Sequence, residues 1–382
     1  MKVERQYQVC SRCVMDTSDP EIDFDDVGVC SHCHKFDAET SKNWFPGKDG
    51  EQRLSVICDG IRKEGKNQEY DCIMGLSGGI DSSYLALKIK DYSLRPLVVH
   101  VDGGWNSELA VHNIERVVDY CGYDLHTQVI QWGEMRDLQV AYLRSGIANQ
   151  DAPQDHAFFA ALYKFAVKNR IRYVISGGNI ATESVFPGAW HHSAMDLDNL
   201  MAIHKRFGTA PLRTFPLMSF SQYYFYFPFI RKMRTVRPLN YMAYDKNEAL
   251  GYLKGRIGYK DYGRKHGESI FTKFFQNYYL PKKFGYDKRR PHLASQVLSG
   301  QMGRDEALLL LEQPLYDSHE LVEDKTYIAK KLRISVEELD ALSTPPGKDY
   351  AEYKNWDRKY MAVKKAQQLV EQFSRKRIGN YS

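Results

Sequence analysis

The sequence predicts an α/β fold built on a parallel sheet, with a small cysteine-rich module before the sheet and a helical region after it. Two observations carry this prediction. Short apolar runs alternate with stretches of helical periodicity between residues 71 and 183, which is the rhythm of βαβ units. Three of the apolar runs end in glycine-containing loops at 75–83, 102–107 and 176–183. Because parallel sheets bind ligands at the carboxyl ends of their strands, we expect the three loops to form one site.

Composition limits the classes of function. The chain has 382 residues, of which 43% are hydrophobic and 26% charged, and its net charge is +5. This small positive charge fits an anionic small molecule better than a nucleic acid, and no apolar window reaches the length of a bilayer span. The first five residues show no apolar signal region, so we expect a cytoplasmic protein without a membrane or nucleic-acid partner. We expect three domains: residues 1–50, 51–240 and a mostly helical 241–382.

The first domain carries four of the seven cysteines, as the pairs Cys10-x2-Cys13 and Cys30-x2-Cys33. Two such pairs are typical of a tetrahedral zinc site, in which each tight turn presents two thiolates. His32 or His34 could replace one thiolate, and two disulfides or a redox pair are the other readings. Four thiolates leave no open position on the metal, so we expect a structural rather than a catalytic ion.

The remaining elements follow from periodicity and from breakers. A polar segment, 43–69, is expected to carry one short helix at 52–63. Strands are predicted at 71–75, 96–102, 127–130 and 173–176. One helix is predicted at 84–89, and a second has an apolar face formed by Val111, Ile114, Val118 and Cys121. A third helix is predicted at 155–169, where Phe158, Leu162 and Phe165 should be buried. The aromatic window 215–230 is expected to be buried helix or loop. Three further helices are predicted: one at 303–312, one that begins at a capping box formed by Ser335 and Glu338, and one from about residue 350.

The loop after the first strand has the composition of an anion site. Two adjacent glycines permit positive φ, and the side chain of Asp81 or Ser82 could cap the following helix, whose first N–H groups carry partial positive charge. No Gly-Lys-Ser/Thr follows, so the loop is not a Walker A motif. The candidate binding residues are Gly75, Leu76, Ser77, Gly78, Gly79, Asp81, Ser82 and Ser83.

The run Ser77-Gly78-Gly79-Ile80-Asp81-Ser82 resembles the PP-loop of the ATP pyrophosphatase superfamily, whose fold is a Rossmann-like parallel sheet of the HUP type. The resemblance implies that the loop holds the β- and γ-phosphates of ATP, which is cleaved to AMP and pyrophosphate. It places the nucleoside near Asp102, and it likens 176–183 to a second glycine motif that contributes Gly177, Asn179 and an acidic residue, Glu183. Ser77, Asp81 and Glu183 are then the catalytic candidates, with Mg²⁺ held between Asp81 and Glu183.

Three later runs narrow the resemblance: 265–274, 287–293 and 303–308. Together with the cysteine pairs and the PP-loop, they resemble the N-acetyl sugar amidotransferases of the WbpG and PseA type. The family resemblance implies that ATP and ammonia convert the acetamido group of a nucleotide-activated sugar to an acetamidino group, through an adenylated imidate, for lipopolysaccharide O-antigen or flagellin glycans. Arginines in the stretches 259–269 and 284–293 could grip a second diphosphate.

Ammonia needs a source, because it is mostly ammonium at neutral pH. Residue 2 is lysine rather than a nucleophilic cysteine, and no Gly-x-Cys-x-Gly elbow occurs. The expected partners, also implied by the family, are a HisH-like glutaminase and a HisF-like subunit that channels ammonia. Two rival functions stay open: a tRNA-thiolating PP-loop enzyme, which would need a reactive thiol from Cys58, Cys72 or Cys121, and a zinc-stabilised nucleotide-binding scaffold without turnover.

Overall fold

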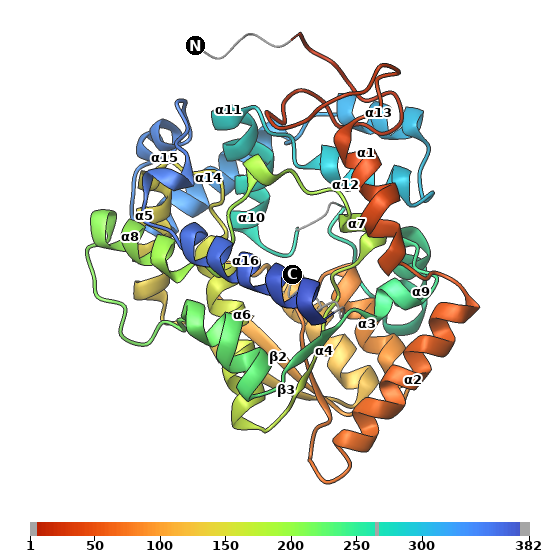
Figure 1. Ribbon diagram of the computed structural model, residues 1–382. Coiled ribbons are helices and arrows are strands. Elements are labelled where there is room, and N and C mark those ends of the chain that lie inside the picture. The colour runs from red at the N-terminus through yellow and green to blue at the C-terminus, as the bar shows by residue number, and fades with distance from the viewer. Residues whose placement is uncertain (1–5, 264–266, 375–382) are drawn as a thin grey trace.

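The computed structural model describes residues 6–263 and 267–374, with side chains up to residue 368. A parallel sheet in the order β3-β2-β1-β4-β5 forms its centre (Figure 1). The strands are β1 (Cys72–Gly75), β2 (Pro96–Asp102), β3 (Asp124–Val129), β4 (Tyr173–Ile175) and β5 (Arg234–Val236). Strand β1 pairs with both β2 and β4, so the loop that follows it leaves the middle of the sheet. The predicted parallel α/β fold is confirmed.

Helices cover both faces of this sheet. On one side lie α2 (Lys48–Glu64), α3 (Ile80–Lys90), α4 (Glu108–Cys121) and α9 (Lys246–Ile257), packed on Cys72, Met74 and Val98. On the other lie α5 (Trp132–Ser145), α6 (Ala152–Lys168) and α8 (Leu197–Phe207), packed on Ile73, Val99 and Val174. Successive residues of β1 therefore enter opposite apolar layers, as the two-residue period of a strand requires.

The C-terminal part is helical, as the sequence predicts. Its α-helices are α10 (Ile270–Phe274), α11 (Leu280–Phe284), α12 (Arg289–Leu298), α13 (Arg304–Glu312), α14 (Ser318–Leu332), α15 (Val336–Leu342) and α16 (Asp357–Ser374). Short helical turns are α1 (Ser31–Lys35), α7 (Ile180–Glu183), η2 (Ser41–Asn43), η3 (Gly188–Trp190), η5 (Pro238–Tyr241) and η7 (Tyr350–Glu352), and three π-helical segments are η1 (Phe36–Thr40), η4 (Gln222–Ile230) and η6 (Phe275–Tyr279). Among the described residues, no helix combines the length and apolarity that a membrane crossing needs.

Three details of the predicted packing are wrong. Val111 is exposed on α4, because the buried face runs through Ile114, Val117 and Cys121 instead. Helix α6 buries its alanines and Leu162, whereas Phe158 and Phe165 are only partly buried, and the ring of Phe158 lies directly against the space beside Gly75. The aromatic window also fails to be buried throughout: Phe229 and Ile230 of η4 are mostly exposed.

The N-terminal module packs against the C-terminal helices. Its four cysteines, Met15 and Ile22 share an apolar cluster with Trp190, Leu293 and Ala307. In Figure 1 the module lies beside α12 and α13, although these two helices are distant from it in the sequence. The guanidinium of Arg304 donates to the carbonyls of Cys10 (2.8 Å) and Cys13 (3.0 Å), and Arg290 pairs with Asp16 at 3.0 Å. These contacts fix the module to α12 and α13.

His156 makes stability depend on pH. Its Nε2 accepts from the N–H of Met218 at 3.0 Å, so Nδ1 carries the proton and donates to the carbonyl of Ala194 at 2.8 Å. Burial lowers the pKa of His156 to about 4. Because the unfolded chain gains a proton below about pH 6.5 while the native imidazole does not, its contribution to the free energy of unfolding should fall by about 1.4 kcal/mol per pH unit between those values.

Urea unfolding between pH 7 and pH 4.5 checks this expectation. The variant His156→Gln keeps one acceptor and one donor but does not titrate, so its free energy of unfolding should decline less steeply with falling pH than that of the parent chain. Equal slopes for the two proteins would contradict the assignment of a neutral, buried imidazole.

Candidate functional site

The loop after β1 turns at Gly78, whose φ of +84° is accessible mainly to glycine. Gly79 has ordinary backbone angles and precedes α3. No side chain caps this helix, so the expectation that Asp81 or Ser82 does so is wrong: Ser82 Oγ donates to the Gly79 carbonyl at 3.2 Å instead. The Gly79 N–H donates to Ser77 Oγ at 3.2 Å. The start of α3 therefore keeps N–H groups available for an anion.

Two tyrosines from the segment after α9 hold this loop. The hydroxyls of Tyr259 and Tyr262 donate to the Gly78 carbonyl at 2.8 and 3.0 Å, and Asn113 of α4 donates to the Tyr262 oxygen at 3.1 Å. Burial raises the pKa of Tyr262 to about 12, so its hydroxyl stays protonated and can donate at neutral pH. A side chain at position 78 would meet the Ala110 carbonyl at 2.8 Å. The conformation of the loop is thus fixed by these neighbouring side chains as well as by the positive φ of Gly78.

Asp81 and Glu183 lie beside the same pair of glycines. A side chain at Gly178 would start 3.7 Å from Glu183 Oε2, and one at Gly177 would start 3.5 Å from the carbonyl carbon of Asp81. The Tyr244 hydroxyl donates to Asp81 Oδ1. Burial raises the pKa of Tyr244, and the negative charges of Asp81 and then Glu183 raise it further. Carboxylates that converge beside a loop of free amides are suitable ligands for Mg²⁺ bridging to phosphate oxygens. These two residues could hold that ion.

The second glycine loop packs directly on the first. A side chain at Gly177 would meet the backbone N of Ser82 at 3.3 Å. One at Gly178 would lie 3.7 Å from Glu183 Oε2 and 3.8 Å from Arg237 Nε, so these two side chains approach the same point. Glycine at position 177 lets the two loops touch, whereas a side chain at position 178 would make ordinary van der Waals contact with Glu183 and Arg237.

A cavity of about 2150 Å³ opens beside these loops. Of the residues predicted from the sequence, it is lined by Gly75, Leu76, Ser77, Gly79, Asp81, Ser82, Gly177 and Glu183. Gly78 shapes the turn of the loop but does not line the cavity, and Ser83 is fully buried.

Two further predicted residues have structural partners. Asp102 accepts hydrogen bonds from the Gly104 N–H at 2.7 Å and from Asn106 Nδ2 at 3.2 Å, which closes the turn after β2. Asn179 caps α7 by accepting from the Thr182 N–H at 2.9 Å. Neither side chain lines the cavity. Asx turns and helix caps account for these contacts.

Sequence reasoning missed the residues that the rest of the chain brings to the cavity. Glu268 lies near the loop, 3.4 Å from where a side chain at Gly79 would start. Asp151 is buried on the cavity wall, where burial raises its pKa, and the Thr272 hydroxyl donates to it at 3.2 Å. Arg237, Lys288 and His292 line the cavity from other elements, and Tyr244 contacts Asp81. Glu268, Thr272, Lys288 and His292 lie in the runs 265–274 and 287–293, whereas no local pattern marks Asp151, Arg237 or Tyr244.

The arginines expected to grip a diphosphate have other partners. Arg289 pairs with Asp287 at 2.7 Å and donates to carbonyls of α13, while Arg290 holds the N-terminal module. Arg264 and Lys265 lie outside the described residues. His191 lines the cavity, and burial, followed by the charge of Lys288, lowers its pKa to about 3. It is therefore neutral at physiological pH.

The four N-terminal cysteines form one cluster whose sulfurs all lie within 4.8 Å of one another. The Sγ–Sγ distances for Cys10–Cys33, Cys13–Cys30 and Cys30–Cys33 are 3.7, 3.6 and 3.6 Å. These match the edge of about 3.8 Å for a tetrahedron with Zn–S bonds of about 2.3 Å. Cys10 Sγ also accepts N–H groups from Arg12, Cys13 and Cys30. The cluster is compatible with zinc.

The two nearby histidines are engaged elsewhere. His32 Nε2 lies 2.7 Å from Asp19, and His34 Nε2 lies 2.9 Å from Asp25. The remaining cysteines, Cys58, Cys72 and Cys121, are buried and do not line the cavity. Burial raises the pKa of Cys58 to about 12 and that of Cys121 to about 11, so neither presents a ready thiolate.

Comparison with known proteins gives one family match. Residues 268–367 match the family described as LPS biosynthesis protein WbpG-like, C-terminal domain. No curated protein matches the sequence. Solved structures similar to this chain include an NH3-dependent NAD synthetase from Campylobacter jejuni (14% identity, 78% of this chain and 98% of that chain, TM-score 0.32) and an NMN synthetase from Francisella tularensis (14% identity, 79% and 98%, TM-score 0.32). A third is an NAD+ synthetase from Burkholderia pseudomallei (15% identity, 89% and 98%, TM-score 0.30). The C-terminal region is thus similar to the WbpG-like domain.

Proposed function

We propose that this chain is an ATP-dependent N-acetyl sugar amidotransferase of the ATP pyrophosphatase superfamily. One observation carries the proposal. The region that matches the WbpG-like domain contributes Glu268, Lys288 and His292 to the same cavity that the loop 75–83 lines. The loop that resembles a PP-loop and the region similar to the WbpG-like domain therefore line one space.

The proposed reaction begins at the acetamido oxygen of a nucleotide-activated sugar. Resonance makes an amide oxygen a poor leaving group, and the same delocalisation gives peptides a rotation barrier of about 18–20 kcal/mol. Attack of this oxygen on the α-phosphate of ATP forms an adenylated imidate and releases pyrophosphate. Ammonia then adds to the imidate carbon, AMP leaves, and an acetamidino group remains.

The residues at the loop support the first of these steps. N–H groups at the start of α3 and the Ser77 and Ser82 hydroxyls face the cavity where pyrophosphate would form. Preorganised donors of this kind are typically worth roughly 2.7–4 kcal/mol each. Asp81 and Glu183 would hold Mg²⁺, which neutralises phosphate charge when bound. Tyr244 keeps Asp81 in place through its hydroxyl.

Ammonia is proposed to come from a HisH-like glutaminase through a HisF-like subunit, in the cytoplasm. The product would serve lipopolysaccharide O-antigen or flagellin glycan synthesis. The tRNA-thiolating alternative has less support, because the three cysteines outside the N-terminal cluster are buried away from the cavity.

The proposal is tested by incubating the protein with ATP, Mg²⁺, ammonium and single acetamido nucleotide-sugars. We expect AMP, pyrophosphate and a sugar whose mass falls by the difference between an oxygen atom and an NH group. Bulk tRNA in place of the sugar serves as the comparison. AMP formation that depends on tRNA, or no AMP with any sugar, would overturn the proposal.

A further inference from the structure

The cavity is larger than one nucleotide needs. Pockets for single small ligands commonly measure roughly 300–1,000 Å³, whereas this cavity measures about 2150 Å³. The loop 75–83 lines it at the carboxyl end of β1, the central strand. One part of the remainder extends over β4 and β5 and is lined by residues of α6, η4 and α16. This second part has its own set of aromatic and cationic side chains.

Two tyrosines form a wall of this second part. Tyr163 of α6 and Tyr223 of η4 both line the cavity, with ring centroids 6.3 Å apart. Phe227 packs behind Tyr163 at 4.9 Å. The two rings are inclined at 65° to each other, so one of them can present its face to a planar base. Stacking of this kind is typically worth about 1–3 kcal/mol per base.

Arg237 connects this wall to the carboxylates. It follows β5 and approaches the same point near Gly178 as Glu183 does. Its positive charge also acts on Tyr163 and Tyr223, since it lowers the pKa that burial raises in each. An anion bound by Arg237 would therefore lie near Glu183, in the cavity that Tyr163 and Tyr223 also line. A guanidinium is well suited to bind phosphate with two parallel hydrogen bonds.

Helix α16, whose Tyr360 packs on Tyr224 of η4, adds polar side chains to this part of the cavity. Lys364, Gln367 and Gln368 line the cavity, and their spacing of three and four residues places them on one helical face. Lys364 is exposed at the rim. In Figure 1 the helix runs across the front of the molecule toward its centre. It thus presents one cation and two amides, which can both donate and accept hydrogen bonds.

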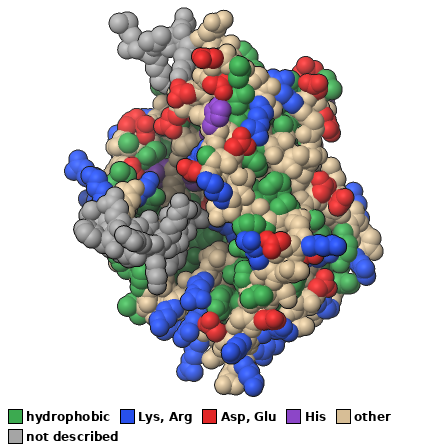
Figure 2. Space-filling view, turned by 45° about the vertical axis from the view of Figure 1, so that its right-hand side comes forward, with side chains coloured by type: hydrophobic (Ala, Val, Ile, Leu, Met, Phe, Trp, Pro, Cys, Tyr) green, Lys and Arg blue, Asp and Glu red, His purple; other side chains and the backbone are tan. Residues whose placement is uncertain are grey.

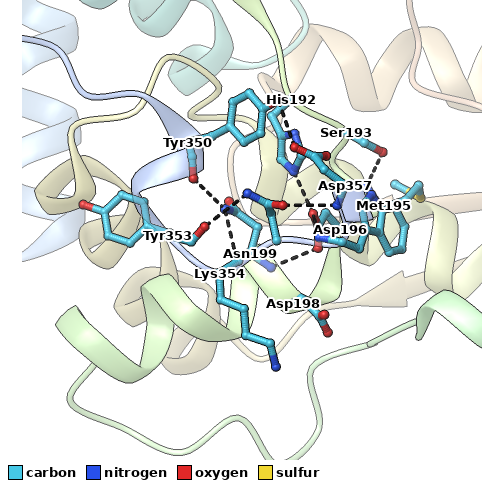
Figure 3. A network of polar contacts seen from close by, with 12 residues as sticks. His192, Ser193, Met195, Asp196, Asp198, Asn199, Tyr350, Tyr353, Lys354 and Asp357 are labelled. Carbon is cyan, nitrogen blue, oxygen red and sulfur yellow. Dashed lines mark hydrogen bonds and ion pairs between the residues drawn. The ribbon is translucent and has the colours of Figure 1, made fainter. Parts of the chain in front are cut away.

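The start of α16 is firmly anchored (Figure 3). The Trp356 N–H donates to Asp196 Oδ2 at 2.8 Å, and His192 Nε2 lies 2.8 Å from the same oxygen. The Tyr350 hydroxyl donates to Asp357 Oδ2 at 3.2 Å. Asp196 in turn caps α8 through the Asn199 N–H at 3.0 Å. Lys364 and the two glutamines are therefore carried by a helix whose position is set by the core.

We propose that this second part of the cavity is the subsite for the acceptor nucleotide, with the phosphate bound by Arg237 and Lys364 and the base between the Tyr163–Tyr223 wall and α16. The assignment rests on the proposed function, because it concerns the substrate of the same reaction. A nucleotide-sugar placed in this way directs its sugar toward Asp81 and Glu183. The recognised chemistry is a nucleoside mono- or diphosphate.

The test uses the full chain saturated with a non-hydrolysable ATP analogue and Mg²⁺, into which UDP or CMP is titrated by calorimetry. We expect one of the two probes to bind without displacing the analogue. Lys364→Ala and Arg237→Gln should weaken that probe about tenfold, Lys364→Arg should restore most of the affinity, and Lys365→Ala, a neighbour outside the cavity, should stay within about twofold.

Affinity for the ATP analogue, measured on each variant, separates this subsite from the loop and shows that the variant is folded. Displacement of the analogue by the probe, binding of neither probe, or equal affinities for Lys364→Ala and Lys365→Ala would overturn the subsite. Because AMP formation with a sugar substrate is measured separately, such a result would leave the proposed function standing.

Discussion

Replacing Asp81 with asparagine, or Glu183 with glutamine, is expected to lower the rate of AMP formation at least about a hundredfold, which corresponds to roughly 2.7 kcal/mol of transition-state stabilisation. Each change removes one negative charge beside the loop while keeping the shape of the side chain. In the Asp81→Asn variant the amide oxygen could still accept the hydrogen bond that the Tyr244 hydroxyl donates to Asp81, so the fold should persist.

Asp91→Asn is the matched control, because Asp91 is an exposed carboxylate at the other end of the same helix. Rates should be measured across a Mg²⁺ titration together with thermal melts. Full turnover by Asp81→Asn or Glu183→Gln at low Mg²⁺ would remove the proposed metal role. A loss of rate equal to that of Asp91→Asn would do the same.

Replacing Cys10 or Cys30 with serine is expected to cost bound zinc and to make the protein insoluble. All four cysteines are fully buried at the centre of the cluster that joins the module to α12 and α13. Zinc contributes about 10–16 kcal/mol to folding in peptide modules of this type, which is comparable with the whole stability of a domain.

Metal analysis of the purified chain, followed by melting with and without a strong chelator, checks this expectation. Cys58→Ala is the matched control, because Cys58 is buried in another cluster and has no sulfur neighbours in the N-terminal group. A parent chain that contains no zinc, or a Cys30→Ser variant that keeps its zinc and its melting temperature, would contradict the assignment.

The centre of the sheet could be predicted because β1, β2 and β4 are apolar runs whose residues are almost all buried, whereas β3 is mostly exposed. Strand β5 was not predicted, since Arg234 and Thr235 are exposed and only three residues pair with β4. Helix α5 was also missed, although it caps itself through Gln131. In these elements tertiary contacts, rather than local pattern, decide the structure.

The candidate site likewise combines residues that the sequence predicts with residues that only the fold brings together. Ser77, Asp81 and Glu183 could be proposed because glycine loops follow strands whose carboxyl ends share one edge of the sheet. Asp102 and Asn179 carry the same local signal, yet their side chains close a turn and cap a helix. Arg237 and Tyr244 carry no signal, because contacts across the fold bring Arg237 to the cavity and Tyr244 to Asp81. Figure 2 shows cationic and anionic side chains interspersed on the face in view, in keeping with the small net charge.

Helix α7, which ends at Glu183, is a single turn held by α12. Ser299 Oγ donates to the Ala181 carbonyl at 2.8 Å, and the Val185 N–H donates to Ser295 Oγ at 2.9 Å. Helix α12 is joined in turn to the cysteine module through Arg290. Exchanging residues 268–367 between related chains would therefore also exchange the helix that holds Glu183, the proposed Mg²⁺ ligand, so we expect working chimaeras to inherit the cysteine module, α7 and α12 from one parent.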